Sequence, residues 1–537
     1  MNWRLISRLL GLLCLLIAGA MCLSLPWSLP WCGQTPLFER DSFFGMLQAI
    51  SISVTVSLLL VLWGRRAEGT VLRKEALAVV GLGWLLSGAL GALPYLLTPT
   101  FRLPGIPMSP ADAMFESVSG FTTTGASVLT QLERVPEFED CEAAAMTGHI
   151  AYIPRCVLFW RSFTHWLGGM GIIVLFVAIL GQLGAGGKAL MRREVPGPVS
   201  DTVRPRIRDT AVVMWGIYLG LSVLLTILLM LQQMSLFDAL CHTFGTMATG
   251  GFSTRNLSVG AYSDPVLELT IIVFMVAAGV NFNLYYLLLY QSADLRQLRF
   301  RSRLTRFLRD PELRLYGALI AIATLMISAS LVHSGQYTAG DAVRHSAFSV
   351  VTIITTTGFG TEDFVQWPAV THAILLVLMY VGGCSGSTGG GIKVIRILIL
   401  FRLLKLEIEK AFRPNLVKPL RVSGGRVPDL ITHNILVYTA LIAVISVISW
   451  MLIVFLEPSV QWDRTTGRGG EKLLDCGSAV VATLNNIGPG IGVCGPHGNY
   501  TSFTELSKLV MTVLMLLGRL ELFAIIVLFV PSFWKNE

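Results

Sequence analysis

One short motif occurs four times in this chain and limits what it can fold into more than any other feature. Each copy opens near an Asp, continues as a short apolar stretch, ends in an oxygen-rich turn closed by Gly, and precedes a long hydrophobic segment. Gly permits the unusual backbone dihedrals that turn carbonyl groups inward, so four such loops around one axis can present a ring of oxygens to a cation. The motif therefore predicts four pore loops and an ion pathway. The copies are Asp112 to Gly125, Asp238 to Gly250, Asp341 to Gly358 and Asp475 to Gly488.

The closing turns supply the candidate ion-binding residues. A cation that leaves water needs replacement oxygens on all sides, and one loop offers them on only one side. No copy contains the longer Thr-Val-Gly-Tyr-Gly sequence of potassium channels, so we expect fewer ion sites in series. The candidates are Thr123, Thr124 and Gly125; Ala248, Thr249 and Gly250; Thr356, Thr357 and Gly358; and Asn486, Ile487 and Gly488.

The four Asp residues also have a local role. We predict that they cap short loop helices, because a side-chain oxygen at that position accepts hydrogen bonds from free amides. The opposite end of each helix would then direct roughly half a negative elementary charge toward the centre, which favours a cation. Ordinary N-caps in re-entrant segments are the plainer interpretation, and it is compatible with a pore.

Composition indicates a membrane protein independently of the motif. Apolar residues make up 53% of the chain, charged residues 14%, and the mean hydropathy is +0.66. Runs of about 20 apolar residues, enough to cross roughly 30 Å of hydrocarbon, predict about ten spans. These spans are 9–30, 43–63, 75–98, 157–183, 209–233, 266–290, 314–333, 369–401, 430–456 and 505–533.

The order of spans and loops predicts an all-α membrane protein. Two extra transmembrane helices form a preface at 1–70. Four pseudo-symmetric helix–pore-loop–helix repeats follow around a central pore, at 75–195, 205–310, 311–426 and 427–537. The spacing of the four turns is too irregular for a solenoid and suits a bundle made by duplication.

The net charge of +8 raises nucleic-acid binding as an alternative, and the placement of the 41 basic residues argues against it. Most lie in linkers on one side of the predicted spans, including Arg65 and Arg66, Lys188 to Arg208, and Lys393 to Arg426. Basic residues are enriched in cytoplasmic loops of membrane proteins. We therefore predict cytoplasmic termini and linkers, pore loops that enter from outside, and no nucleic-acid partner.

Two further alternatives concern the ends of the spans and the nine Cys residues. Arg4 and Arg8 precede an apolar run, as in a signal peptide, but the run continues to Leu25, which favours a retained span. Two Cys pairs flank loops that the topology places outside, where an oxidising compartment could bridge them. The pairs are Cys141 with Cys156 and Cys476 with Cys494.

Several segments in combination resemble the Trk/Ktr potassium transporter family, over nearly the whole chain from about residue 40. The two-span preface is more similar to the Trk pore subunit than to the shorter Ktr one. The segments are Phe159–Phe163, Trp166–Gly171, Asn281–Asn283, Gly382–Lys393, Asn486–Gly490 and Gly518–Glu521.

The resemblance implies a potassium uptake pore in the cytoplasmic (inner) membrane, with potassium as the transported ion and no organic cofactor. It implies one key Gly per repeat, a homodimer with one pore per subunit, and a cytoplasmic nucleotide-binding regulatory ring docked on the basic linkers. In related plant transporters a Ser at the first key position accompanies sodium preference, so Gly125 favours potassium. A sodium-permeable pore, or a potassium symporter coupled to protons or sodium, remains the alternative.

A Gly-rich run interrupts the third inner span. Each Gly in a helix interior costs about 1 kcal/mol relative to Ala, so we predict a break there. Unwound backbone within a membrane survives only where protein or a water-filled cavity receives it. Close helix packing through small residues is the alternative. The family resemblance implies an intramembrane gate loop, formed by Gly382, Gly383, Cys384, Ser385, Gly386, Ser387, Thr388, Gly389, Gly390 and Gly391.

Two basic residues join the predicted gate. Arg519 lies mid-span, where a charge costs about 2.5–3.5 kcal/mol on insertion scales, so it should face water or a partner. The family resemblance places it in the pore below the filter, and a structural ion pair with Glu521 or Glu116 is the alternative. Lys393 follows the Gly run and either adds to the gate or marks the cytoplasmic boundary.

Enzyme motifs do not withstand inspection. Residues 181–188 resemble a phosphate-binding loop, but the spacing is off by one and Ala189 replaces the Ser or Thr that holds magnesium. The eight His residues are dispersed without metal-ligand spacing. We therefore expect no enzymatic activity.

Overall fold

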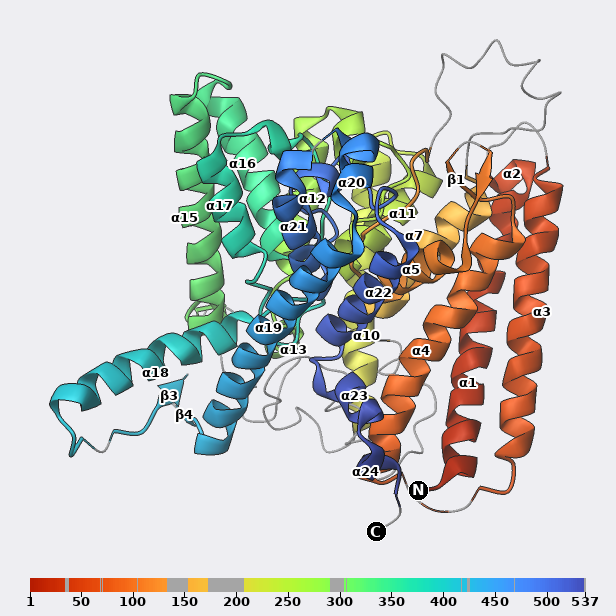
Figure 1. The fold of residues 1–537 in the computed structure, drawn as a ribbon, viewed down its shortest axis with the longest axis horizontal. Helices are drawn as coiled ribbons and strands as arrows, with labels where there is room; N and C mark the ends of the chain where they lie inside the picture. Colours follow the sequence, from red (N-terminus) through yellow and green to blue (C-terminus); the bar gives the residue numbers. More distant parts are fainter. Residues whose placement is uncertain are drawn as a thin grey trace.

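The computed structural model describes residues 1–33, 38–67, 69, 71–103, 105–132, 153–171, 207–289, 304–305, 307–416, 418–422, 425–467 and 469–535. Cys141, the phosphate-loop-like segment at 181–188 and the basic linker at 188–206 lie outside these residues. Both ends of the described chain lie on the same side of the molecule (Figure 1).

The described residues are almost entirely helical, which confirms the all-α fold. The first half contains α1 (Trp3–Cys22), α2 (Pro30–Gly33), α3 (Arg40–Trp63), α4 (Arg73–Leu97), α5 (Pro110–Phe121), α7 (Arg155–Gly169), α10 (Ile207–Leu231), α11 (Leu236–Ala248), α12 (Pro265–Ala278) and α13 (Phe282–Leu289). The second half contains α15 (Pro311–His333), α16 (Ala339–Ile354), α17 (Ala369–Leu378), α18 (Val394–Phe412), α19 (Asp429–Leu456), α20 (Ser459–Thr466), α21 (Lys472–Leu484), α22 (Glu505–Arg519), α23 (Phe523–Ile526) and α24 (Pro531–Trp534).

Strands are confined to two small hairpins among the described residues. In the first, β1 (Phe101–Leu103) pairs antiparallel with β2 (Ile106–Pro107) just before α5. In the second, β3 (Arg421–Val422) pairs antiparallel with β4 (Gly425–Arg426) between α18 and α19.

A long helix, a short helix and a shorter or broken helix follow one another four times. The short helices α5, α11, α16 and α21 lie on the side of the molecule opposite the termini, where they pack among the longer helices (Figure 1). The preface helices α1 and α3 pack against each other and against α4 at one edge of the bundle. The described part of the chain contains six helices long and apolar enough to cross a membrane, or up to eight if each bent pair counts as one span.

The sequence analysis predicted too many continuous spans. The predicted spans 266–290 and 505–533 are bent pairs, with angles of 91° between α12 and α13 and 117° between α22 and α23. The predicted span 369–401 ends as a helix at Leu378, and α18 then projects sideways from the bundle (Figure 1). The first inner helix, α7, ends at Gly169, shortly before an undescribed segment.

The breaks have local causes. Gly279 follows the last residue of α12, and Gly518 stands just before the end of α22. After α22, Glu521 and Leu522 both adopt left-handed backbone, with φ of 53° and 67°. Such dihedrals cannot continue a right-handed helix and are strained for side chains other than Gly.

None of the four predicted Asp residues is the N-cap of its short helix, so the predicted caps are wrong in position. In three of these helices a Ser or Thr is the N-cap, and the Asp stands three residues later, as in a capping box. In α5, the Ser109 hydroxyl accepts from the amide of Asp112 at 3.2 Å, and the Asp112 carboxylate accepts from the amide of Ser109 at 3.4 Å. The hydroxyls of Ser235 and Thr338 likewise accept from the amides of Asp238 and Asp341, at the starts of α11 and α16. In α21, Asp475 instead accepts from the amide of Val493.

The cysteines considered as a bridged pair in the last repeat are free thiols. Cys476 and Cys494 are both buried and unbridged, as is Cys156. Their burial fits the packing role expected of small residues in membrane segments.

Candidate functional site

The four closing turns share one backbone geometry. Each begins with a residue in left-handed conformation, with φ between 55° and 59°. The amide of the next residue donates to the carbonyl oxygen five positions earlier. The third residue is a left-handed Gly, with φ between 78° and 92°. In chain order the turns are Thr123, Thr124 and Gly125; Thr249, Gly250 and Gly251; Thr356, Thr357 and Gly358; and Asn486, Ile487 and Gly488.

This geometry shifts the expected register of the second turn by one residue. Gly251, which the sequence analysis omitted, is the equivalent of Gly125, and Gly250 is the equivalent of Thr124. Ala248 instead ends α11 and packs against Gly169 at the end of α7. The Gly250–Gly251 pair was ambiguous in the sequence, because either Gly could close the motif.

The left-handed glycines adjoin one another in a closed order. A Cβ atom added to Gly125 would overlap the carbonyl oxygen of Gly250. The same addition to Gly251 would overlap that of Thr357, and to Gly358 that of Ile487. A Cβ on Gly488 would lie 2.6 Å from the carbonyl oxygen of Thr124, which returns the series to the first turn.

Two conclusions follow from this closed order. First, the four turns surround one centre, as the sequence predicted. Second, only Gly fits, because a side chain would both strain the left-handed backbone and strike the next turn.

Hydrogen bonds from side chains support the turns. Asn486 donates through Nδ2 to Thr124 Oγ1 at 2.9 Å and to the carbonyl oxygen of Met515 at 2.9 Å, which joins the fourth turn to the first. The Tyr500 hydroxyl donates to the carbonyl oxygen of Gly488 at 2.7 Å. Tyr500 was missed because its position depends on the fold of the segment after α21, for which the sequence offers no periodic signal.

His165 joins the first and second turns. Its ring Nδ1 lies 2.7 Å from the carbonyl oxygen of Gly120, and its Nε2 accepts from the amide of Phe252 at 3.3 Å. The ring is fully buried and sits against Gly250.

Buried ion pairs fix the short helices to their neighbours. Arg161 Nε lies 2.6 Å from Glu116 Oε1, and Arg161 also donates to the carbonyl oxygen of Ser253 in the loop after α11. Lys508 Nζ on α22 lies 2.6 Å from Asp112 Oδ1 on α5, and both side chains are almost completely buried. A buried charge without a partner is costly, so these pairs hold the frame around the turns rigidly.

The predicted gate loop is an ordered turn directly beneath the ring. Val381 and Ile392 pair across its base. Its Gly390 amide donates to Thr356 Oγ1 at 2.6 Å, and a Cβ on Gly390 would lie 2.5 Å from the carbonyl oxygen of Asn485. Close helix packing through small residues does not describe this segment, since α17 has already ended.

Neighbouring elements hold the loop through backbone groups. The Cys384 amide donates to the carbonyl oxygen of Gly279 at 2.8 Å, and the Gly386 carbonyl accepts from the amide of Phe282 at 3.1 Å. Both contacts come from the bend between α12 and α13. The broken second inner helix therefore forms one wall of the loop.

Glu312 is the most informative residue that sequence reasoning missed. This buried carboxylate at the start of α15 accepts from the Ser385 amide at 2.5 Å and from the Ile395 amide at 3.1 Å. It thus spans the loop, from its first half to the first turn of α18. A charged residue at the predicted end of a span is common, so nothing in the sequence marked it.

Arg519 binds backbone carbonyls on two other elements. Its Nη1 donates to Thr388 O at 2.7 Å, and its Nη2 donates to Gly168 O at 2.5 Å and Gly169 O at 2.9 Å. The carboxylates considered as its ion-pair partners bind other arginines. Glu521 Oε2 lies 2.6 Å from Arg396 Nη2, and Glu116 pairs with Arg161.

Lys393 completes the lower side of the loop. Its buried ammonium donates to the carbonyl oxygen of Gly389. It is also the N-cap residue of α18, so it lies where the loop returns to helix. Its roles as a gate member or as a marker of the cytoplasmic boundary stay predictions.

Comparison with known proteins places this architecture among cation transporters. The family model TrkH, described as a cation transport protein, matches residues 91–536. The chain is 36% identical to the Trk system potassium uptake protein TrkH of Halomonas elongata and 35% identical to that of Escherichia coli K12, each over the full length of both chains. The crystal structure of the potassium transporter TrkH from Vibrio parahaemolyticus superposes with a TM-score of 0.80 at 30% identity, and covers 100% of both chains.

Proposed function

The chain belongs to the TrkH family of cation transport proteins, and from this premise we propose that it forms a pore through which potassium ions enter the cell. The observation that carries the proposal is the closed ring of left-handed glycines, Gly125, Gly251, Gly358 and Gly488. Relatives that match over the full chain are named as potassium uptake proteins.

The ring would bind the ion through main-chain oxygens. The carbonyl groups of the four turns replace the water shell of a monovalent cation as it enters. The proposed set of ion-binding residues therefore contains Gly251 and no longer contains Ala248. The short helices end at the turns, so their partial negative charge lies close to the ion and lowers its energy there.

The loop at 382–391 would act as the gate below this filter. It touches the turns directly through the hydrogen bond from Gly390 to Thr356. Arg519 lies beside it and would repel a cation until the loop moves. The buried position of Thr388 and its bond to Arg519 support a closed conformation of this contact.

Transport would be driven by the membrane potential, which is worth about 2.3 kcal/mol per charge per 100 mV. We place the protein in the cytoplasmic (inner) membrane with both termini in the cytoplasm. The side-by-side termini and the basic residues of α18 and its hairpin support this orientation. A homodimer with a cytoplasmic nucleotide-binding ring docked on the basic linkers completes the proposed assembly.

Growth rescue tests the proposed function. A potassium-uptake-deficient strain that expresses the chain should grow at low external potassium, and growth should be insensitive to added sodium. Failure to rescue at normal membrane expression would contradict potassium uptake. Rescue that requires sodium or an imposed proton gradient would replace the simple pore by a coupled symporter.

A further inference from the structure

The helix α18, the hairpin β3–β4 and the start of α19 form a small folded unit outside the bundle. They share a hydrophobic core of their own, built on buried Ile399 from α18, Val427 from the segment after the hairpin, and Ile435 from α19. The hairpin is therefore fixed against α18, although α18 itself projects away from the other helices (Figure 1).

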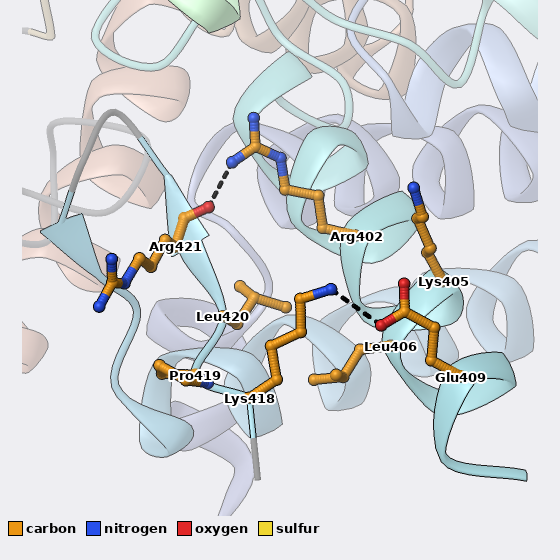
Figure 2. Close-up of a pocket in the computed structure, with 8 residues that line it drawn as sticks. All are labelled: Arg402, Lys405, Leu406, Glu409, Lys418, Pro419, Leu420 and Arg421. Carbon is orange, nitrogen blue, oxygen red and sulfur yellow. Dashed lines mark hydrogen bonds and ion pairs between the residues drawn. The ribbon is translucent and has the colours of Figure 1, made fainter. Parts of the chain in front are cut away.

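A basic hollow lies between the hairpin and α18. It has a volume of about 370 Å³, and Figure 2 shows the residues that line it. Four of its eight lining residues are basic, one is acidic and three are apolar. The lining residues are Arg402, Lys405, Leu406, Glu409, Lys418, Pro419, Leu420 and Arg421.

Two of the basic residues build the hollow, and two remain available to a ligand. Arg402 donates to the carbonyl oxygen of Arg421, and Lys418 Nζ lies 2.8 Å from Glu409 Oε2, so both contacts seat the hairpin on the helix (Figure 2). Within the described residues, the side chains of Lys405 and Arg421 make no hydrogen bond or ion pair. The hollow therefore has surplus positive charge.

A neighbouring face of α18 carries an exposed apolar stripe. Phe401, Leu404, Ile408 and Phe412 follow one another at three- or four-residue spacing and are 57–65% exposed. Side chains at this spacing share one helix face. The adjoining spanning helix α19 also exposes apolar side chains, beginning with Leu430 at 70%. Exposed apolar side chains of this kind are suited to contact with lipid.

We propose that this unit binds an anionic phospholipid, with the phosphate headgroup in the basic hollow and the stripe against the neighbouring acyl chains. Charge complementarity favours a negatively charged headgroup, and basic pockets beside spanning helices are suited to such lipids. An amphipathic helix that lies in the interface buries its apolar face among the acyl chains while basic side chains meet the headgroups. Because α18 follows the gate loop directly, the bound lipid would fix the helix that begins after Lys393 and contains Arg396.

Lipid retention on the purified full chain tests the proposal. The protein in mild detergent is offered phosphatidylglycerol or phosphatidylcholine, and native mass spectrometry counts the retained lipid. The wild type should prefer phosphatidylglycerol. Lys405→Gln with Arg421→Gln should lower that retention by about fivefold per side chain. Glu409→Gln, which removes the only negative charge of the hollow, should raise it.

Matched controls separate this site from general charge. Arg65→Gln with Arg66→Gln removes the same charge from an exposed turn elsewhere, and should leave the retention unchanged. Equal losses in both double variants, or no loss in the first with its thermal midpoint unaltered, would overturn the proposal. Occupation by inorganic phosphate with no preference for phosphatidylglycerol would overturn the lipid assignment.

The stripe has its own test. Phe401→Gln with Ile408→Gln should lower lipid retention and leave the number of chains per particle unchanged. A change in that number, without loss of lipid, would show that a second copy covers the stripe instead.

Discussion

The guanidinium of Arg519 donates to the carbonyl oxygen of Thr388 at 2.7 Å and thereby ties α22 to the loop beneath the ring of turns. Because the same guanidinium also binds Gly168 and Gly169, three separate segments meet at one side chain. In the proposed pore, an ion can pass only after this contact opens.

Replacing Arg519 by Ala should raise the initial rate of rubidium uptake into cells or liposomes. Hydrogen bonds from a charged group contribute about 1.5–3 kcal/mol, so the loss of one alone shifts the closed–open equilibrium by roughly ten- to hundredfold. Arg519→Lys should give an intermediate rate. Lysine keeps the positive charge, but all its N–H donors lie on one nitrogen, so it cannot bind both segments as the guanidinium does. Arg314→Ala, at an exposed position on α15, serves as the control. An unchanged rate in Arg519→Ala would remove this residue from the gate.

Replacing Gly251 by Ser should weaken discrimination between potassium and sodium, as we expect for Gly125→Ser and Gly358→Ser. The new Cβ would strike the carbonyl oxygen of Thr357 and displace an oxygen of the ring. Gly335→Ser is a matched control, because Gly335 has φ of 71° but nothing within 4 Å of an added Cβ. Competition between sodium and rubidium uptake measures the change. Equal selectivity in the Gly251 and Gly335 variants would argue against the register found here.

The sequence predicted the four turns well because their chemistry is local. A left-handed Gly after oxygen-bearing residues is visible in one dimension, and three of the four registers, at Gly125, Gly358 and Gly488, match the observed geometry. The second register failed at Gly250 because two adjacent glycines satisfy the same pattern. The left-handed backbone of Gly251 and its contact with Thr357 decide between them.

Features that depend on distant contacts could not be read from the sequence. Hydropathy predicted 505–533 as one span, because hydropathy carries no information on the left-handed backbone at Glu521 and Leu522. Glu312 contacts the gate loop by accepting hydrogen bonds from amides more than seventy positions away along the chain. The alternative of an ion pair between Arg519 and Glu521 likewise depended on the direction of the Glu521 side chain, which the sequence does not give.

Glu312 should be required for an ordered gate loop. Glu312→Ala leaves the buried amide of Ser385 and the part-buried amide of Ile395 without this acceptor, at up to about 1–3 kcal/mol each. We expect a lower thermal midpoint and a raised rubidium leak. Glu312→Gln retains an acceptor oxygen and should restore most of both properties. If Ala and Gln behave alike in both measurements, the hydrogen bonds do not position the loop.

The ion pair between Lys508 and Asp112 should stabilise the frame strongly. Lys508→Met leaves a buried carboxylate with a weaker partner, Arg102 at 3.4 Å, and should destabilise the protein by up to about 3–5 kcal/mol. Lys410→Met breaks the exposed pair with Glu407 and should cost only about 0–1 kcal/mol. Thermal midpoints in one detergent compare the two variants, and similar shifts would contradict a special role for the buried pair.

Stability should fall as the pH rises because of Glu39, which lies just before α3 and accepts from the Arg155 amide at 3.1 Å. Burial raises the pKa of Glu39 to about 7. Between its ordinary value, about 4.3, and 7, the folded protein holds a proton that the unfolded chain has released, so the free energy of unfolding decreases across that window.

Glu39→Gln keeps an acceptor for the amide and carries no charge. Its thermal midpoint should therefore decline less than that of the wild type between pH 5 and pH 8. Glu505→Gln, at an exposed carboxyl, should follow the wild type. Parallel curves for Glu39→Gln and the wild type would show that this carboxyl does not take up a proton on folding.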